Sequence, residues 1–95
     1  MNSHTVVRRN PQVVARELAP PAGAVLLHLD TGAYHGLNRV GLIVWELIDG
    51  ARSVADLVSG VRERIADTPA QVDEDVRAFV EGVLDRGLVE IVQPK

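Results

Sequence analysis

Cysteine is absent from the 95-residue chain. Without it the chain cannot form a disulfide bond, a thiolate metal site, an iron–sulfur cluster or a cysteine nucleophile. Long hydrophobic runs are also absent. No run approaches the about 20 residues that span a membrane, and the N-terminus lacks the basic segment and apolar core of a signal peptide. We therefore expect a cytoplasmic protein that does not enter a membrane.

Positive charge is scarce as well, because the formal net charge is −3 and the sequence pI is about 5.5. Sequence-independent binding to nucleic acid depends on a basic surface, and the small pair Arg8 and Arg9 does not supply one. We expect no nucleic-acid partner. Apolar residues make up 46% of the chain and charged residues 24%, an ordinary globular composition that is sufficient for one domain with a modest core.

Residues suited to chemistry are few. His4, His28 and His35 are not spaced as metal ligands, and we interpret His28 and His35 as exposed histidines of a sheet. None of the three serines has the context of a nucleophile, and no glycine-rich phosphate-binding motif is present. We therefore predict no catalytic residue, no metal site and no cofactor.

The N-terminal half is predicted to form strands. Residues 1–11 show no sustained period and are interpreted as a flexible lead-in, with order beginning near Gln12. Residues 13–18 suit a short strand that ends before a Pro-Pro-Ala-Gly loop. Residues 24–30 alternate at a period of two, and Asp30-Thr31-Gly32 is typical of the turn that joins such a strand to a second one over residues 33–37.

Two helices are predicted next. Asn38 suits an N-cap, and apolar residues follow at helical spacing until Gly50, a natural C′ residue. Ser53 and Asp56 resemble a capping box that opens the second helix. The predicted buried stripes are Val40, Ile43, Val44, Leu47 and Ile48 in the first helix, and Val54, Leu57, Val58, Val61 and Ile65 in the second.

The third helix is predicted to start with Thr68 as its cap, Pro69 at the first helical position and Gln71 at N3, and to end at Gly87. Residues 88–92 are short and β-branched, so we expect an extended tail that pairs with the sheet. The apolar stripe of this helix comprises Val72, Val76, Phe79, Val80, Val83 and Leu84.

This order of elements predicts an α+β fold. It is that of a winged helix-turn-helix variant, with N-terminal antiparallel strands followed by a three-helix bundle. We expect the folded domain to span residues 12–92.

Three features allow more than one interpretation. Asp73-Glu74-Asp75 is either a solvated first turn that favours the helix dipole or a place where one carboxylate meets a basic side chain of a peptide. Trp45 and Phe79 fit core positions better than ligand stacking. Tyr34 lies on the strand face opposite Leu37 and suits either a plain sheet surface or a contact surface.

A longer pattern runs through the strands, the three helices and the segment after them. Its residues are Leu29 to Asn38, Gly41, Ile43, Trp45, Leu47, Gly50, Ser53, Val54, Asp75, Val76, Phe79, Arg86, Gly87, Leu88 and Val89. The pattern resembles the PqqD-like family of peptide-recognition domains, also termed RiPP recognition elements, over about residues 24–92. Its strand, Leu-Asn junction and helical tryptophan look most like the small free-standing member encoded with lasso-peptide biosynthesis enzymes.

The resemblance implies a non-catalytic module that binds the leader of a ribosomally made precursor and presents it to a leader peptidase and then a cyclase. An edge strand over residues 33–37 would accept the leader by β-strand addition, and pockets toward the third helix would select its side chains. Which border of that helix faces the leader, the Asp73/Arg77 side or the Asp75/Gly82 side, stays open. The candidate peptide-binding residues are Ala33, Tyr34, His35, Gly36, Leu37, Val72, Asp73, Val76, Arg77, Phe79 and Val80.

Three alternatives remain at this point. A winged-helix DNA-binding regulator has a similar order of elements, but its recognition helix needs basic or amide side chains, and this one begins with three acids. A PqqD-type chaperone of another peptide-modification pathway is the second alternative. A small enzyme is the third, although no nucleophile–base pair can be named.

Overall fold

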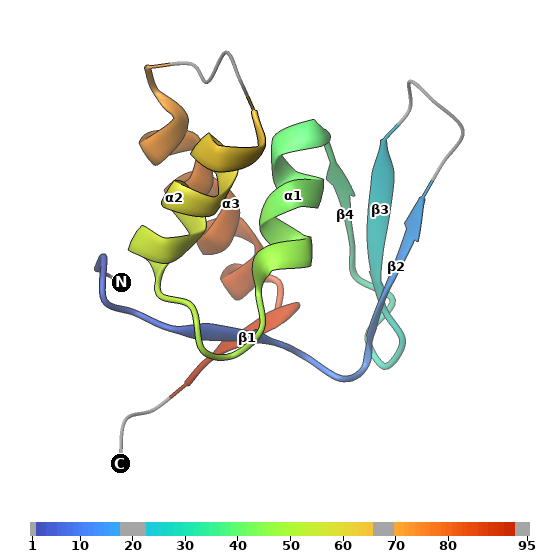
Figure 1. The fold of residues 1–95 in the computed structure, drawn as a ribbon. Coiled ribbons are helices and arrows are strands. Elements are labelled where there is room, and N and C mark those ends of the chain that lie inside the picture. The colour runs from blue at the N-terminus through green and yellow to red at the C-terminus, as the bar shows by residue number, and fades with distance from the viewer. Residues whose placement is uncertain (1, 18–22, 66–69, 93–95) are drawn as a thin grey trace.

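The computed structural model describes residues 2–17, 23–65 and 70–92. Figure 1 shows strands β2, β3 and β4 packed beside a bundle of helices, with β1 below the bundle. The predicted α+β class, with antiparallel strands before three helices, is confirmed. The elements are β1 (Val7–Arg9), β2 (Val13–Glu17), β3 (Ala24–His28), β4 (Tyr34–Leu37), α1 (Arg39–Leu47), α2 (Val54–Arg64), α3 (Val72–Asp85) and β5 (Val89–Ile91).

The main sheet has the strand order β2-β3-β4, and both pairings are antiparallel. The β3–β4 hairpin confirms the predicted turn, in which Gly32 has a φ of +76°. Ala24 and Leu26 are buried toward the helices, whereas Leu27 lies on the other face between Val14 and Tyr34. β4 therefore forms one edge of the sheet.

His28 corrects one prediction, because it is only 6% exposed. It shares the inward face of β3, and its ring closes the hairpin: Nδ1 accepts hydrogen bonds from the backbone N–H groups of Asp30 at 3.2 Å and Thr31 at 3.4 Å. Asn10 Nδ2 lies 3.2 Å from its Nε2. The prediction of an exposed sheet histidine is wrong at this position because the turn and Asn10 satisfy the ring inside the fold.

The first two helices start as predicted. Asn38 caps α1 by accepting a hydrogen bond from Gly41 N–H at 2.8 Å, and Ser53 with Asp56 forms both bonds of a capping box on α2. The predicted place of Gly50 is wrong by one position. The C-cap of α1 is Ile48, so Gly50, with a φ of +81°, lies two residues beyond it.

The start of α3 differs from the prediction. The helix begins at Val72 with Gln71 as N-cap, and Gln71 makes no side-chain capping bond. Its predicted N3 position is therefore wrong, and Thr68 and Pro69 lie outside the described residues. The predicted end is confirmed, since Gly87 follows the C-cap Arg86 with a φ of +72°.

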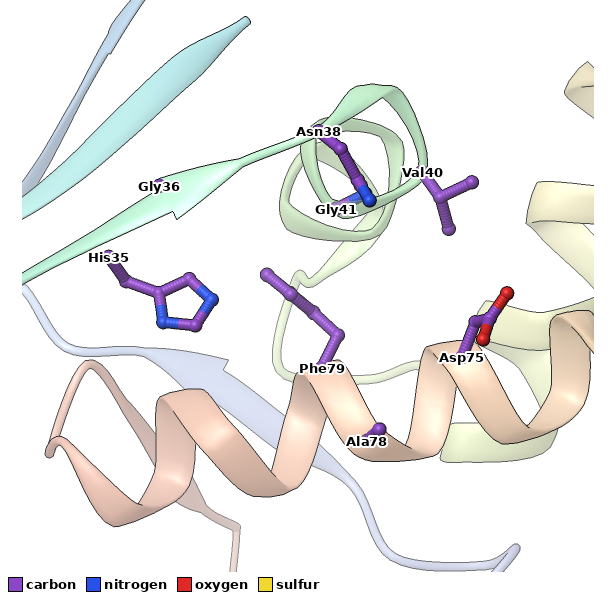
Figure 2. Close-up of a pocket in the computed structure, with 8 residues that line it drawn as sticks. All are labelled: His35, Gly36, Asn38, Val40, Gly41, Asp75, Ala78 and Phe79. Carbon is purple, nitrogen blue, oxygen red and sulfur yellow. The ribbon is translucent and has the colours of Figure 1, made fainter.

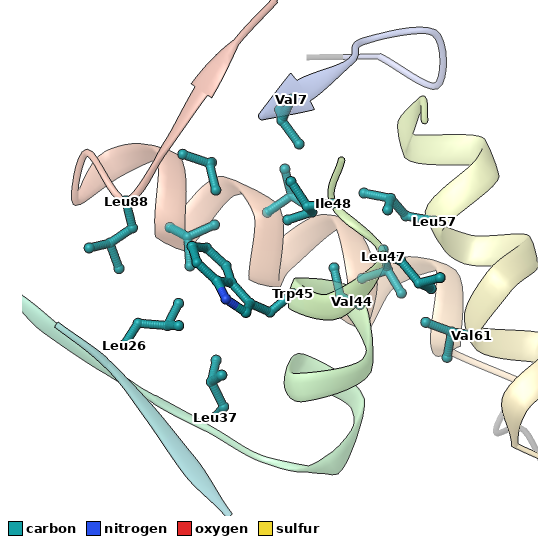
Figure 3. Close-up of a cluster of buried hydrophobic side chains, with 14 of the residues drawn as sticks. Val7, Leu26, Leu37, Val44, Trp45, Leu47, Ile48, Leu57, Val61 and Leu88 are labelled. Atoms are coloured by element: carbon teal, nitrogen blue, oxygen red, sulfur yellow. The ribbon is translucent and has the colours of Figure 1, made fainter. Parts of the chain in front are cut away.

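The core lies between the sheet and the helices (Figure 3). Trp45 is buried near its centre, as predicted, and the guanidinium of Arg9 lies 5.6 Å from the centroid of its ring. Within the three described ranges, no helix is long and apolar enough to cross a membrane. Members of the core include Leu26, Leu37, Val44, Ile48, Leu57, Val61, Val76, Val80 and Leu88.

A second sheet joins the two ends of the chain. β1 pairs antiparallel with β5, opposing Val7 to Ile91, and Val7 is only 1% exposed. The prediction that order begins near Gln12 is therefore wrong, because a three-residue strand is too short to show a period and takes its order from a distant partner. The predicted pairing of the C-terminal tail with the main sheet is wrong for the same reason: β5 pairs with β1.

Candidate functional site

The open edge of β4 is the first feature of the site. Among the described strands, β4 pairs only with β3. His28 of β3 donates its backbone N–H to the carbonyl of Ala33 at 2.8 Å. The next opposed pair along the two strands is Leu27 and Tyr34. Backbone groups alternate in direction along an antiparallel strand. The N–H and C=O groups of Tyr34 and Gly36 therefore point away from β3, and those of His35 point toward it.

A pocket of about 390 Å³ lies beside this edge, between β4, the first turn of α1 and the outer side of α3. Figure 2 shows Phe79 and Asp75 rising from α3 toward the start of α1, with His35 facing Phe79 from the strand. The pocket thus joins a strand edge to a helix face. Its lining residues are His35, Gly36, Asn38, Val40, Gly41, Asp75, Ala78 and Phe79.

Two rings form one end of the pocket. Their centroids lie 5.6 Å apart and their planes meet at 73°, so His35 and Phe79 make an edge-to-face contact. Burial of the imidazole lowers the pKa of His35, and the guanidinium of Arg86 lowers it further. The ring therefore favours its neutral form near pH 7.

The other end of the pocket carries the carboxylate of Asp75, which is exposed. In the part of the chain that the structure describes, this carboxylate has no ion pair and accepts no side-chain hydrogen bond. Asp73, two residues earlier on the same helix, differs in this respect because it pairs with Arg62 at 2.6 Å. The pocket thus presents an unpaired negative charge.

The structure brings together some of the candidate residues named from the sequence. His35, Gly36 and Phe79 line the pocket. Tyr34, 72% exposed, lies on the opposite face of the same strand, and Ala33 immediately precedes it. The side chains that lie in the core instead are Leu37, Val72, Val76 and Val80.

Asp73 and Arg77 lie away from the pocket. Asp73 is held by Arg62 of α2, and Arg77 donates to Ser3 Oγ at 2.5 Å. On α3 the residues that face β4 recur at helical spacing, from Asp75 to Phe79 to Gly82, and a Cβ on Gly82 would lie 3.7 Å from the ring of His35. The Asp75/Gly82 border is therefore the one that faces the strand.

Several lining residues were missed as site candidates. Asn38 is predicted as a helix cap and as part of the family pattern but not as a site residue, although its position at the end of the edge strand indicates a place in the pocket. Gly41 leaves room, since a Cβ there would come within 3.2 Å of Phe79 Cε1. Ala78 precedes Phe79 directly on the same helix. Asp75 was named from the sequence only as one of three acids and as one of two open borders, and its spacing of four residues from Phe79 could have selected it.

Comparison with known proteins gives three findings. Residues 23–89 match the sequence model of the family described as Coenzyme PQQ synthesis protein D (PqqD). PqqA binding proteins of two Pseudomonas aeruginosa strains are 45% identical over 45 residues, which is 47% of this chain and 48% of each relative. The matched segment thus spans about half the length of these curated relatives.

Solved structures are similar over nearly the whole chain. TbiB1, in complex with the TbiA(beta) leader peptide, has a TM-score of 0.70 and 26% identity, covering 92% of this chain and 99% of that one. Lasso peptide synthetase B1, complexed with the leader peptide, has a TM-score of 0.68 and 20% identity. The match covers 88% of this chain and 96% of that one. At 20% identity the second comparison concerns the fold alone.

Proposed function

This chain belongs to the PqqD family, and on that basis we propose that it binds the leader segment of a ribosomally made precursor peptide by adding it as a strand to β4. The observation that carries the proposal is the open edge of β4 beside the pocket of α3. An extended peptide completes such an edge through its own backbone groups, so affinity comes largely from main-chain hydrogen bonds. Tyr34 and Gly36 offer those groups here.

Selectivity has a separate origin in this proposal. In an added strand, alternate side chains point to opposite faces of the sheet. Those on the helix side enter the pocket between His35 and Asp75, and those on the other side lie beside Tyr34. Three fully buried residues of α3 then have an indirect role, because their packing in the core holds α3 at the distance from β4 that the pocket requires. They are Val72, Val76 and Val80.

The pathway we favour is lasso-peptide biosynthesis. The support is the sequence resemblance to the small free-standing member encoded with lasso-peptide enzymes. It is joined by the similarity over nearly the whole chain to TbiB1, which is 26% identical and was solved with a leader peptide. In this role the chain performs no chemistry of its own. It holds the leader in the cytoplasm, where the precursor is made, and presents it to a leader peptidase and then to a cyclase.

Binding to duplex DNA is the competing function for this order of elements. A recognition helix that enters the major groove needs Arg, Lys, Asn or Gln toward the bases. The outer side of α3 instead carries Asp75, Ala78 and Phe79, next to Asp73 and Glu74 in its first turn. The acidic surface of α3 therefore favours a peptide over a nucleic acid.

The test is a pair of titrations at about 150 mM salt. One uses fluorescently labelled leader segments of short precursor peptides from the organism that makes this protein, and the other uses a labelled duplex DNA. We expect saturable binding to the leader and none to the duplex. Binding to DNA alone, weakening steeply as salt rises, contradicts the proposal.

A further inference from the structure

The chemistry of the pocket is uneven along its length. Phe79, Val40 and Ala78 supply apolar surface, and Gly41 leaves space beside the Phe79 ring. Asp75 is the one acid among the lining residues, and no lysine or arginine is among them. A ligand group that fills this space meets an apolar wall first and a carboxylate at its end.

The carboxylate of Asp75 faces this space uncompensated. Two basic side chains of the bundle are engaged elsewhere: Arg62 with Asp73, and Arg77 with Ser3. Arg39, between the lining residues Asn38 and Val40, makes no ion pair with Asp75 in the described ranges. The amide oxygen of Asn38 accepts from Gly41 N–H at 2.8 Å and does not neutralise a charge. Within the described ranges, then, Asp75 makes no ion pair and its carboxylate is open to a ligand.

We propose that this pocket binds one lysine or arginine side chain of the leader, with the apolar stem against Phe79 and the cationic head on the carboxylate of Asp75. The inference rests on the proposed strand addition to β4 and names the residue class that the pocket selects. A long basic side chain suits it because its stem covers apolar surface while its head reaches a polar group. The ring of Phe79 is itself a favourable neighbour of a cation.

The two ends of the pocket differ in charge, and this difference determines where the cation of the leader lies. Asp75 and Phe79 are four residues apart on α3, a rise of about 6 Å along the helix axis that a lysine stem can span. At the other end, Arg86 disfavours a second positive charge beside His35. The basic residue therefore occupies one fixed position of the added strand, on the helix side, at the Asp75 end.

The test is selection from a displayed library of random 15-residue peptides on the parent protein, on Asp75→Asn, on Asp75→Lys and on Glu81→Gln. Glu81 is an exposed acid of α3 outside the pocket lining, so its variant matches the loss of one charge. We expect lysine or arginine to be enriched at one position with the parent and with Glu81→Gln. The enrichment disappears with Asp75→Asn and changes to aspartate or glutamate with Asp75→Lys.

A selected peptide is then titrated against each folded variant. Replacing its basic residue with norleucine, which keeps the stem and removes the charge, should weaken binding to the parent about three- to tenfold and leave binding to Asp75→Asn unchanged. Equal losses on the two proteins overturn the assignment of Asp75. The assignment is also overturned if the selected peptides bind by strand addition but show no enrichment of lysine or arginine at any position.

A fourth variant separates this proposal from the one on which it depends. Gly36→Pro removes an outward amide of β4. If the selected peptides bind Gly36→Pro as they bind the parent, or if no peptide is enriched at all, strand addition itself is wrong and the pocket assignment falls with it. If the peptides lose binding to Gly36→Pro but bind the Asp75 variants as they bind the parent, only the assignment of the basic side chain is wrong.

Discussion

The ring of His35 on β4 meets the ring of Phe79 on α3 edge to face, at 5.6 Å between centroids. This contact is the point where the edge strand and the helix touch across the groove. It lies between the main-chain groups of β4 that would accept a peptide and the pocket that would select its side chains. Changes at either ring should therefore alter binding more than they alter the fold.

Phe79→Ala should weaken leader binding about tenfold or more while costing about 1–3 kcal/mol of stability, because the ring is only partly buried. Isothermal titration and urea denaturation measure the two effects. Leu84→Ala is the matched control: it removes a partly buried apolar side chain of the same helix outside the pocket. Equal binding by Phe79→Ala and the parent contradicts a role for the ring.

Gly36→Pro should reduce binding of every leader tested by about tenfold or more, because proline cannot donate a backbone hydrogen bond at the open edge. Gly36→Ala keeps the amide, and its Cβ would have no atom within 4 Å, so it should bind like the parent. Circular dichroism confirms that both variants fold before titration. Strand addition to β4 is excluded if the proline variant binds normally.

His35→Pro is expected to act differently. Its N–H points toward β3, so proline there removes a bond of the sheet itself and should lower stability.

Acid should destabilise the fold through His35. Its pKa is lowered by burial and by Arg86, so the unfolded chain takes up this proton more readily than the folded chain. The contribution of neutral His35 to the free energy of unfolding is complete above the ordinary pKa of histidine. It is lost as the pH falls from that ordinary pKa toward the lowered pKa of the folded protein. Urea denaturation from pH 8 to about pH 5 should show a smaller loss of stability for His35→Gln than for the parent. Identical pH profiles for the two proteins would argue against this mechanism.

Val76→Ala should lower the free energy of unfolding by about 1–3 kcal/mol, because Val76 is fully buried. Val14→Ala removes the same atoms from the outer face of the sheet, where Val14 is 40% exposed, and should cost less than about 0.5 kcal/mol. Both folded variants should bind the leader like the parent. Lost binding by folded Val76→Ala, with stability intact, would place Val76 in the site rather than behind it.

Local sequence signals predicted local structure well. Asn38, and Ser53 with Asp56, mark helix starts through hydrogen bonds to residues three positions away, so the information is contained in a few neighbours. The Asp30–Gly32 turn is equally local. These signals were sufficient for the order of the elements from β2 to α3, and hence for the position of the strand edge.

Predictions that depended on distant neighbours were less accurate. His28 reads as a surface residue of an alternating strand, but Asn10, 18 positions away, covers its ring. The apolar stripe of α3 cannot be divided by sequence into core and groove, since Val76 and Val80 are buried while Phe79, between them, reaches the pocket. Only the packing of α1 and β4 against α3 decides which residues of the stripe lie in the core and which line the pocket.

The ribbon of β1 and β5 has a consequence for how the chain folds. It joins Arg8 to Glu90, which are 82 positions apart. Closing so long a loop costs about 2 kcal/mol more entropy than closing the β3–β4 hairpin if the intervening chain is still disordered. This ribbon should therefore form after the hairpin and the helices, which makes its closure a late step in folding. Amide protons of β1 should consequently become protected later than those of β3 in a pulse-labelled refolding experiment.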